Sequence, residues 1–530
     1  MKVANAKYDY YDNPQISDVK ELVELYKDSD RIAFEWRDNG KLEKRSFETT
    51  YEDIKALGSY LAAHYRGKHI AVIGENSYAW IICALAIVLS GNVCVAIDKD
   101  LDEESLKRQL KIADVDAVFY SENYCDHVTK LVRDAHPFGE LEEDIKSGKM
   151  MPFKMSAKRD DPAMIFFTSG TTGFSKAVVL SQRNIARNLF GAGAIFTPRE
   201  RTMSFLPYHH AFGFVTSALN PYFYHVTTYV CGSLKHLAED FKFAKADTTF
   251  VVPMVVETLY KQIWRTARRE GREKKLKFGI KLSNGLRRVG IDARKKIFKT
   301  ILDSFGGNME FIICGGAHLD KKYVEWFRGI GIEILNGYGI TECAPVVSVN
   351  RNYYHRDGSI GQICRDVDVK IVDGEIVVGG DTVMLGYYKD RKATNEVLKD
   401  GYFYTGDLGR IDEDGFLWIT GRKKNLIILS NGENVSPEEI EGALAREKGI
   451  EEVLAYEDEN KIAVAVVPEK RYLGDQDYFD DIIYKYNQDK PKNRQIAVVR
   501  LRTEAFPRNH NGKILRDKVI KEQKDERESN

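Results

Sequence analysis

The sequence lacks an excess of charge of either sign, because 79 lysine and arginine residues balance 79 aspartate and glutamate residues. A neutral chain gives no reason to expect nucleic acid as a partner. Long apolar runs are also lacking: the longest, AWIICALAIVL, is too short to cross a bilayer. The first residues, MKVANAKYDYYDN, lack the apolar core of a signal peptide. We therefore expect a cytoplasmic protein without a membrane span.

Cysteine is scarce and forms no C-x-x-C pair. The cysteines are odd in number and far apart, which favours reduced, mostly buried thiols over a metal or redox centre. They are Cys83, Cys94, Cys125, Cys231, Cys314, Cys343 and Cys364. No repeat recurs at a fixed period, and the only low-complexity stretch is the charged tail KEQKDERESN, which is typical of a solvated chain end.

What is present is a regular alternation of apolar strands and helices in a chain long enough for several domains. HIAVIG, NVCVAI and DAVFYS predict strands, separated by the helices SYAWIICALAIVLSG and ESLKRQLKIAD. A second series follows, with strands TTFVVP, MEFIIC and IEILNG, a helix from about Val256 and another across KKYVEWFRGI. This pattern predicts an α/β fold with two parallel sheets, or one large one, flanked by helices.

Two strands of the second series end in unusual loops. MEFIIC runs into Gly315, Gly316 and Ala317, and IEILNG runs into YGITE. Ligands of such sheets bind beyond the carboxyl ends of the strands, so we expect these loops to be neighbours.

The pattern of the sequence changes near residue 422, where shorter strands and helices begin. LIILSNGENV predicts a hairpin with an Asn-Gly turn. After it, Ser436, Pro437 and Glu439 are typical of an N-cap, a first-turn proline and a capping-box glutamate. Further strands and helices complete a compact α+β domain. We therefore expect domains at 1–421 and 422–530.

The stretch FFTSGTTGFSK, residues 166–176, crowds hydroxyl groups and glycines in front of a lysine. Glycines admit a ligand close to backbone N–H groups, hydroxyls donate hydrogen bonds and lysine adds positive charge, which together suit phosphate oxygens. The spacing differs from the common P-loop, because Phe174 and Ser175 separate Gly173 from Lys176. PAMIFF and KAVVLS flank it as strands, so no helix dipole is expected to help.

Seven motifs in order carry a resemblance over nearly the whole length: TSGTTGFSK, LPYHHAFG, CGGAHL, NGYGITE, YTGDLGRIDEDGF, GRKKNLIILSNGENVSPEEIE and PRNHNGKILR. The chain resembles adenylate-forming (AMP-binding) enzymes. The stretch from TARREGREKK to SFGGN is similar to that of bacterial long-chain fatty acyl-CoA synthetases. The resemblance implies a large N-terminal domain with βαβ-type sheets and a small β-barrel-like part, followed by a small mobile α+β C-terminal domain.

The resemblance also implies a reaction in two steps. A carboxylate attacks the α-phosphorus of ATP and releases pyrophosphate; a thiol, here that of coenzyme A, then attacks the resulting acyl-AMP. The acid is already ionised at pH 7, so positioning and charge neutralisation by Mg²⁺, lysine and backbone donors suffice without a strong base. A medium- or long-chain fatty acid is the implied substrate.

Site residues carry over from the motifs that match. The phosphate loop would comprise Thr168, Ser169, Gly170, Thr171, Thr172, Gly173 and Lys176. In NGYGITE, Tyr338 would stack on adenine, Thr341 would reach the α-phosphate and Glu342 would bind Mg²⁺, which often uses one protein carboxylate when phosphates fill other positions. The Gly315–Ala317 backbone would lie along the adenine and acyl pocket.

The remaining matches concern the ribose and the moving domain. Asp407 and Arg422 would hold the ribose hydroxyls, and His210 would gate the acyl pocket rather than transfer a proton. Lys513 would bridge the carboxylate and the α-phosphate during adenylation and leave when the small domain turns about a hinge near Lys424. Gly432 would then approach the pantetheine arm.

Three points stay open from the sequence. The acceptor thiol belongs to coenzyme A or to an acyl carrier protein, and a catalytically silent nucleotide-binding regulator is the alternative of another class. Basic residues dominate segment 265–299, which is either a solvated helix face, a contact for anionic lipid on the inner membrane face, or a dock for carrier protein or the phosphates of coenzyme A. Acyl chain length is not readable.

Overall fold

The computed structural model describes residues 9–38, 40–151, 156–168, 175–429, 434–508 and 514–529, and it excludes the side chains of residues 234 and 526–529. Site roles are predicted for some residues that lie outside this part of the chain, namely Ser169, Gly170, Thr171, Thr172, Gly173, Gly432 and Lys513. The chain forms two compact units, which are described separately. Unit 1 comprises Met1–Lys370, Val377–Tyr404 and Asp412–Leu417, and unit 2 comprises Ile371–Ile376, Thr405–Ile411 and Trp418–Asn530.

The first sheet of unit 1 has seven strands, and the βαβαβ prediction is confirmed in it. β3, β4, β5, β6 and β7 run parallel, β8 is antiparallel to β7, and β18 is antiparallel to β8. In sheet order the strands are β18 (Gly386–Tyr387), β8 (Lys176–Ser181), β7 (Pro162–Thr168), β4 (Val93–Ile97), β3 (His69–Ile73), β5 (Ala117–Tyr120) and β6 (Ala135–Pro137).

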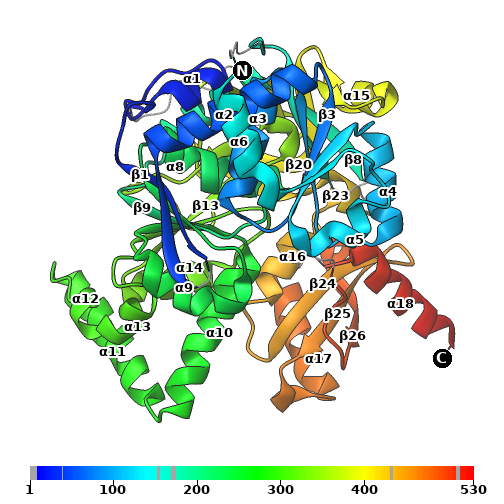
Figure 1. Ribbon diagram of the computed structural model, residues 1–530. Helices are drawn as coiled ribbons and strands as arrows, with labels where there is room; N and C mark the ends of the chain where they lie inside the picture. The colour runs from blue at the N-terminus through cyan, green and yellow to red at the C-terminus, as the bar shows by residue number, and fades with distance from the viewer. Residues whose placement is uncertain are drawn as a thin grey trace. The chain divides into compact units, whose positions relative to one another are not determined.

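The helices beside this sheet follow from their side chains. α3 (Tyr78–Leu89) is apolar on every face and almost wholly buried, and the Ser77 side chain caps it by accepting from the Trp80 N–H. α2 (Phe47–His64) packs against α3 and against α6 (Leu141–Lys149), as Figure 1 shows. α4 (Glu103–Ile112) is amphipathic and buries Leu106 and Leu110. The alternation read from the sequence therefore yields helices whose apolar side chains pack against the sheet.

The second sheet of unit 1 has nine strands. β9 to β13 and β1 pair in parallel, whereas β14, β15 and β2 pair antiparallel to their neighbours. In sheet order they are β15 (Gln362–Ile363), β14 (Val346–Val349), β13 (Glu333–Gly339), β12 (Phe311–Cys314), β11 (Thr248–Val251), β9 (Arg201–Ser204), β10 (Thr227–Val230), β1 (Ile32–Asp38) and β2 (Lys41–Ser46).

Four helices follow β11 before the chain returns to the sheet at β12. α10 (Pro253–Arg269) begins three residues before the predicted start, because Pro253 suits the first turn of a helix, where no N–H bond is lost. α11 (Glu273–Arg288), α12 (Arg294–Ile297) and α13 (Lys299–Ser304) complete the series, and α10 and α11 extend away from the sheet (Figure 1). α14 (Lys321–Ile330) matches the prediction KKYVEWFRGI residue for residue.

A five-stranded sheet contains the boundary between the two units. β16 (Val367–Val372), β17 (Glu375–Gly380), β20 (Tyr402–Ile411) and β19 (Leu398–Lys399) pair in that order, and β21 (Leu417–Arg422) pairs with β20. Gly409 lies on β20 where an added Cβ would be 2.5 Å from the Trp418 carbonyl oxygen, so no larger residue fits.

The rest of unit 2 is a small α+β body. Its sheet consists of β24 (Ile450–Asp458), β25 (Lys461–Pro468) and β26 (Ile496–Leu501), and its helices are α16 (Pro437–Leu444), α17 (Gln476–Asn487) and α18 (Arg516–Ser529). β22 (Ile427–Ile428) and β23 (Asn434–Val435) form the predicted hairpin; its turn lies outside the described residues.

The capping box predicted at α16 does not form. Ser436 is the N-cap residue and Pro437 occupies the first turn, but the serine side chain accepts no N–H bond from the helix. Its hydroxyl donates instead to the Thr420 carbonyl at 2.7 Å and lies 2.9 Å from the Glu438 carboxylate. The competing bond to Thr420, a residue of β21, therefore replaces the local cap.

The seven cysteines are free thiols, and all except Cys125 are buried, as predicted. Burial raises the pKa of the Cys83 and Cys343 thiols well above the usual value, which keeps them protonated. None of the helices in the described part of the chain is long and apolar enough to span a bilayer.

Candidate functional site

The two unusual loops of the second sheet are neighbours, as predicted. β12 and β13 pair in parallel with Cys314 opposite Asn336, so Gly315 follows the end of β12 on the side of the sheet where β13 continues to Gly339. The Gly315 N–H donates to the Val251 carbonyl at 3.1 Å, which ties this loop to β11 as well. The carboxyl ends of three adjacent strands therefore form one edge.

Glycine is required at Gly339 and favoured at Gly315 and Gly316. An added Cβ on Gly315 would lie 3.0 Å from the Phe212 ring, and one on Gly339 would lie 2.2 Å from the Pro345 carbonyl oxygen. Gly316 has φ of +85°, which side chains rarely tolerate. The backbone at Gly315–Ala317 thus runs against the aromatic ring of the HHAFGF stretch, with Gly316 and Ala317 exposed.

Tyr338 lies on β13 opposite Ser348 of β14, and its side chain is buried. Thr341 and Glu342 follow in the short 3-10 helix η5 (Thr341–Cys343), and both are half-buried. The stacking of Tyr338 on adenine and the contact of Thr341 with a phosphate stay predictions.

Glu342 and Lys176 meet through a tyrosine that sequence reasoning missed. The Tyr387 hydroxyl donates to Glu342 Oε1 at 2.8 Å, and Lys176 Nζ lies 4.6 Å from the centroid of the Tyr387 ring. A cation at this distance from a ring face is attracted by its electrons. One buried ring therefore joins the predicted phosphate lysine to the predicted metal carboxylate.

Strand pairing places this ring. β18 pairs with β8 in a register that sets Tyr387 opposite Val178, and the Tyr388 N–H donates to the Ala177 carbonyl at 2.8 Å. Burial, followed by the charge of Glu342, raises the pKa of Tyr387 far above its usual value. The phenol therefore stays protonated and donates a hydrogen bond to Glu342. Tyr387 is 45 residues from Glu342, so no local pattern signals the contact.

The two histidines of LPYHHAFG occupy different environments. His209 is buried, with Nε2 3.5 Å from Asp98 Oδ1, whereas His210 is half-buried, and the two ring centroids are 4.2 Å apart. Burial, then the neighbouring His210, lowers the pKa of His209 well below its usual value. His209 is thus a buried, neutral imidazole, and the role of His210 in the acyl pocket stays a prediction.

The aromatic residues around these histidines form core. Tyr208 and Phe214 pack on Trp80 with ring centroids 5.4 Å and 4.9 Å apart, and Tyr222 and Phe223 are fully buried. These aromatic side chains are packed against one another and belong to the core of unit 1.

Within unit 2, Asp407 and Arg422 form an ion pair. Arg422 Nε lies 2.8 Å from Asp407 Oδ1, and the aspartate side chain is only 3% exposed while the arginine is 39% exposed. Beside them, the buried Glu375 accepts from the Gly406 N–H and from Lys423, both at 2.9 Å. The structure thus brings the predicted ribose residues together; their contact with ribose stays a prediction.

Lys424, the predicted hinge residue, follows directly in the 3-10 helix η6 (Lys423–Asn425). Desolvation and then the positive charge of Arg422 lower the pKa of this lysine. Its proximity to the Asp407–Arg422 pair follows from the end of β21, which carries Arg422 as its last residue.

The donor set at Glu342 fits a magnesium ion that is shared with a nucleotide. Among the described residues, no three histidine, cysteine, aspartate or glutamate side chains cluster as metal ligands. Mg²⁺ keeps several waters and commonly uses one or two protein carboxylates together with substrate phosphates. A single carboxylate oriented by a tyrosine suits a magnesium ion of this kind. It does not suit an ion held by protein ligands alone.

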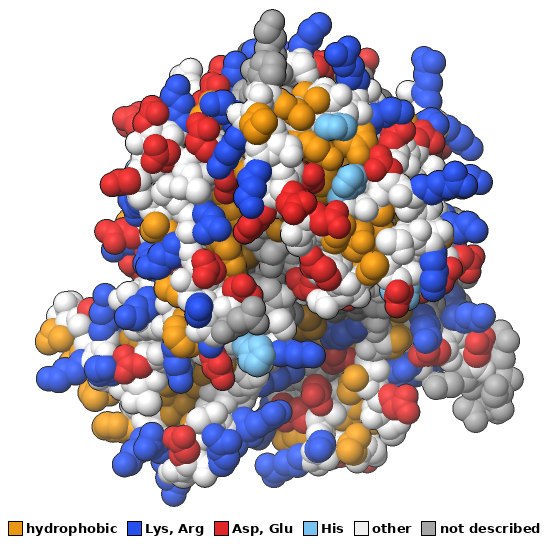
Figure 2. Space-filling view, viewed as in Figure 1, with side chains coloured by type: hydrophobic (Ala, Val, Ile, Leu, Met, Phe, Trp, Pro, Cys, Tyr) orange, Lys and Arg blue, Asp and Glu red, His pale blue; other side chains and the backbone are white. Residues whose placement is uncertain are grey.

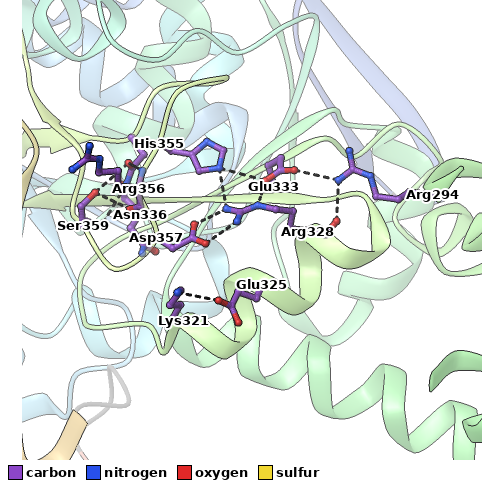
Figure 3. A network of polar contacts seen from close by, with 11 residues as sticks. Arg294, Lys321, Glu325, Arg328, Glu333, Asn336, His355, Arg356, Asp357 and Ser359 are labelled. Atoms are coloured by element: carbon purple, nitrogen blue, oxygen red, sulfur yellow. Dashed lines mark hydrogen bonds and ion pairs between the residues drawn. The ribbon is translucent and has the colours of Figure 1, made fainter. Parts of the chain in front are cut away.

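A polar network fixes the opposite end of the strand that carries Tyr338 (Figure 3). Arg328 of α14 donates to Glu333 at 2.8 Å, to Asp357 at 2.7 Å and to His355 Nε2 at 2.9 Å. Arg294 donates to the other oxygen of Glu333 at 3.2 Å. Burial would raise the pKa of Asp357, but the bond from Arg328 outweighs it and the pKa is lowered. The network therefore ties α14 to the start of β13.

Comparison with known proteins matches two long parts of the chain to one enzyme family. A family model described as AMP-binding enzyme matches residues 23–388, and one described as AMP-binding enzyme C-terminal domain matches residues 424–529. A long-chain-fatty-acid–CoA ligase of Mycobacterium bovis is 28% identical over 427 residues, covering 73% of this chain and 71% of the relative. Long chain acyl-CoA synthetase 3 of Arabidopsis thaliana is 27% identical, covering 81% and 74%.

Solved structures share the fold. An anthranilate CoA ligase in complex with anthranoyl-AMP superposes with a TM-score of 0.76 at 16% identity, covering 97% of this chain and 98% of that one. ATP-bound MatB from Rhodopseudomonas palustris gives 0.75 at 22% identity, covering 96% and 99%. At these identities the likeness establishes the architecture and no more.

Proposed function

Because this chain belongs to the AMP-binding enzyme family, we propose that it is an ATP-dependent acid–thiol ligase that joins a fatty acid to coenzyme A. A carboxylate oxygen attacks the α-phosphorus of ATP, which forms acyl-AMP and expels pyrophosphate. The thiol of coenzyme A then attacks the acyl carbonyl carbon, which forms the thioester and expels AMP, while the thiol proton passes to solvent. The observation that carries the proposal is the match of both family models together with the long-chain ligases among the relatives.

The Lys176–Tyr387–Glu342 group supports the first half-reaction. Lys176 supplies positive charge to the phosphates, and its position over the Tyr387 ring restrains a long, flexible side chain. Glu342 would hold Mg²⁺, which neutralises phosphate charge when bound, and the Tyr387 hydroxyl keeps this carboxylate in one orientation. Thr168, beside the phosphate loop and paired with Lys176 across two strands, is proposed to donate to the same phosphates.

Asp407 and Arg422 are proposed to hold the ribose diol. A carboxylate accepts hydrogen bonds from both hydroxyls, and the guanidinium can donate. The buried Asp407 is fixed by its bond from Arg422, which leaves little freedom to lose when the nucleotide binds. Lys424 remains the proposed hinge, Lys513 the proposed catalytic lysine and Gly432 the proposed pantetheine contact.

Long-chain fatty acid is the proposed acid, since that is the acid in the names of several relatives. Coenzyme A is the proposed acceptor, and an acyl carrier protein is the alternative. A cytoplasmic location with peripheral contact on the inner membrane face, through the basic segment 265–299, belongs to the same proposal, because long-chain fatty acids partition into lipid.

One assay tests this function. The full-length protein is incubated with ATP, Mg²⁺ and acids from acetate to palmitate, and pyrophosphate release is measured with coenzyme A or an acyl carrier protein as acceptor. We expect release with fatty acids and an acyl-CoA product. If thioester formed only on the carrier protein, the acceptor would be an acyl carrier protein instead of coenzyme A. If no acid led to pyrophosphate release, the result would favour a nucleotide-binding regulator.

A further inference from the structure

Glu375, the first residue of β17, is a buried carboxylate in a protein whose charges lie mostly at the surface. Figure 2 shows red and blue side chains mixed over one face of the molecule, and ion pairs in such exposed positions contribute little to stability. The Glu375 side chain is only 7% exposed, although its partner Lys423 is 64% exposed. Because a buried carboxylate is unfavourable unless it is paired and hydrogen-bonded, its partners indicate what it holds in place.

The two oxygens of Glu375 bind two different segments of unit 2. Oε1 accepts from the Gly406 N–H at 2.9 Å, and Oε2 accepts from Lys423 Nζ at 2.9 Å. Gly406 directly precedes Asp407 in the chain, and Lys423 directly follows Arg422. One carboxylate therefore binds a chain neighbour of each member of the Asp407–Arg422 ion pair.

The next residue of β17, Ile376, holds the same stretch of β20. Its carbonyl accepts from the Thr405 hydroxyl at 2.7 Å, and that hydroxyl accepts from the Asp407 N–H at 3.0 Å. Gly406 lies between these two residues with φ of +71°, a left-handed conformation that favours glycine. β17 therefore fixes the backbone from Thr405 to Asp407, and with it the direction in which the Asp407 side chain leaves the strand.

The bond from Lys423 to Glu375 restrains the other half of the ion pair. Arg422 is the last residue of β21, and Lys423 begins the 3-10 helix η6. Arg422 is 39% exposed, so close packing alone does not hold its side chain. A lysine anchored on a buried carboxylate restrains the end of the strand from which Arg422 projects.

We propose that Glu375 is a positioning residue for nucleotide recognition, which holds Asp407 and Arg422 in the geometry that binds the ribose diol. This inference rests on the proposed function, which assigns the ribose to that pair. Glu375 acts through its neighbours and does not itself touch the nucleotide. A displaced pair forms poorer hydrogen bonds, so loss of this support should weaken binding to the ribose hydroxyls in particular. A carboxylate that only stabilised unit 2 would lower the Tm without changing nucleotide preference.

Direct binding of nucleotides to the full-length protein tests this role without dependence on turnover. Isothermal titration calorimetry measures the Kd for ATP and for 3′-deoxy-ATP in the presence of Mg²⁺, and wild type should bind ATP about ten-fold more tightly. Glu375→Gln keeps an acceptor for the Gly406 N–H but turns an amide N–H toward the Lys423 ammonium. This variant should bind ATP about five-fold more weakly and 3′-deoxy-ATP less than about two-fold more weakly.

Variants of Lys423 give a second test at an exposed side chain, which decides the question if Glu375→Gln does not fold. Lys423→Met removes the ammonium group and should weaken ATP binding by about three-fold, again with little effect on 3′-deoxy-ATP. Lys423→Arg keeps the positive charge and should bind both nucleotides as wild type does. In the double variant Glu375→Gln with Lys423→Met, the amide no longer faces an ammonium group, so ATP binding should be tighter than in Glu375→Gln alone.

Asp458→Asn is the matched control, because Asp458 is another buried carboxylate of unit 2. Its side chain is 4% exposed and lies 2.5 Å from Arg500, in the sheet of β24, β25 and β26. This variant should lower the Tm, as Glu375→Gln should, because both break a buried ion pair. It should leave the Kd for ATP and for 3′-deoxy-ATP as in wild type.

The outcomes separate the role of Glu375 from the ligase activity. A selective loss of ATP binding in a protein that releases no pyrophosphate with any acid would support the positioning role and reject the proposed function. If Glu375→Gln and Lys423→Met bound both nucleotides as wild type, or weakened both equally, Glu375 would be a structural residue only and the inference would be wrong. Equal affinity of wild type for ATP and 3′-deoxy-ATP would also overturn it, whatever the ligase activity.

Discussion

At the scale of single residues, Tyr387 positions two predicted site residues although it belongs to none of the sequence motifs. Its hydroxyl orients the carboxylate of Glu342 while its ring faces Lys176, so one buried side chain positions two groups of opposite charge. Such a residue acts through its neighbours and need not touch the nucleotide. Removal of the Tyr387 hydroxyl should therefore change the Mg²⁺ concentration that the reaction requires more than the affinity for the acid.

Tyr387→Phe keeps the ring under Lys176 and removes only the hydroxyl. A hydrogen bond to a charged group contributes ~1.5 kcal/mol or more, so the Mg²⁺ concentration for half-maximal pyrophosphate release should rise about ten-fold. The adjacent Tyr388→Phe is the matched control, because its hydroxyl bonds to the distant Asp114. An unchanged Mg²⁺ requirement in Tyr387→Phe would show that Glu342 needs no such support.

Asp407 is tested with altered nucleotides. If it accepts from the ribose hydroxyls, wild type should use ATP about ten-fold better than 2′-deoxy-ATP or 3′-deoxy-ATP, judged by kcat/KM for pyrophosphate release. Asp407→Asn should lower activity with ATP and lose this preference. Asp412→Asn, in the same stretch but paired with Arg356, should retain it. A preference that survives in Asp407→Asn would assign the ribose contact to other groups.

At the scale of elements, the stability of the junction between α14 and β13 depends on pH through His355. Burial, then the charge of Arg328, lowers the pKa of His355, so this histidine is neutral in the fold. The unfolded chain takes up a proton near pH 6.5, whereas the folded chain resists it. This contribution to stability is therefore full above the unfolded pKa and is lost as the pH falls toward the folded pKa.

His355→Gln keeps an acceptor for Arg328 and cannot titrate. The decrease in Tm between about pH 7.5 and about pH 5.5 should be smaller in this variant than in wild type, by about 1 °C or more. His64→Gln, at the exposed end of α2, should behave as wild type. Differential scanning calorimetry at both pH values measures the difference, and an equal decrease in wild type and His355→Gln would contradict the assignment.

At the scale of the whole molecule, two compact units divide the proposed site residues. Tyr338, Thr341 and Glu342 belong to unit 1, whereas Asp407 and Arg422 belong to unit 2. The proposed reaction has two half-reactions, and the resemblance assigns Lys513 to the first alone. Adenylation and thioester formation should therefore respond differently to changes in unit 2.

Lys513→Ala should depress adenylation by about a hundred-fold or more, since it removes a charge that stabilises the transition state. Thioester formation from supplied acyl-AMP should change by less than about three-fold. Single-turnover assays of each step measure both rates, and Lys518→Ala on α18 is the exposed-lysine control. Equal losses in both steps would reject a lysine that serves only one of them.

Prediction from sequence succeeded where the determining contacts are local. The register of apolar residues gave α14 its bounds, and strand–helix alternation gave the first sheet, because each pattern repeats over a few neighbouring residues. The α16 capping box failed because Thr420, distant in sequence, offered the Ser436 hydroxyl a better partner than its own helix did.

The sequence by itself determined the order of strands and helices, the glycines at the sheet edge and the family, since these depend on residue type and local spacing. Only the tertiary structure decided that Tyr387 meets Glu342 and that Glu375 meets Gly406 and Lys423. The first depends on the register of β18 on β8, and the second on the pairing of β17 with β20. Both are contacts between segments far apart in the chain, which no local pattern encodes.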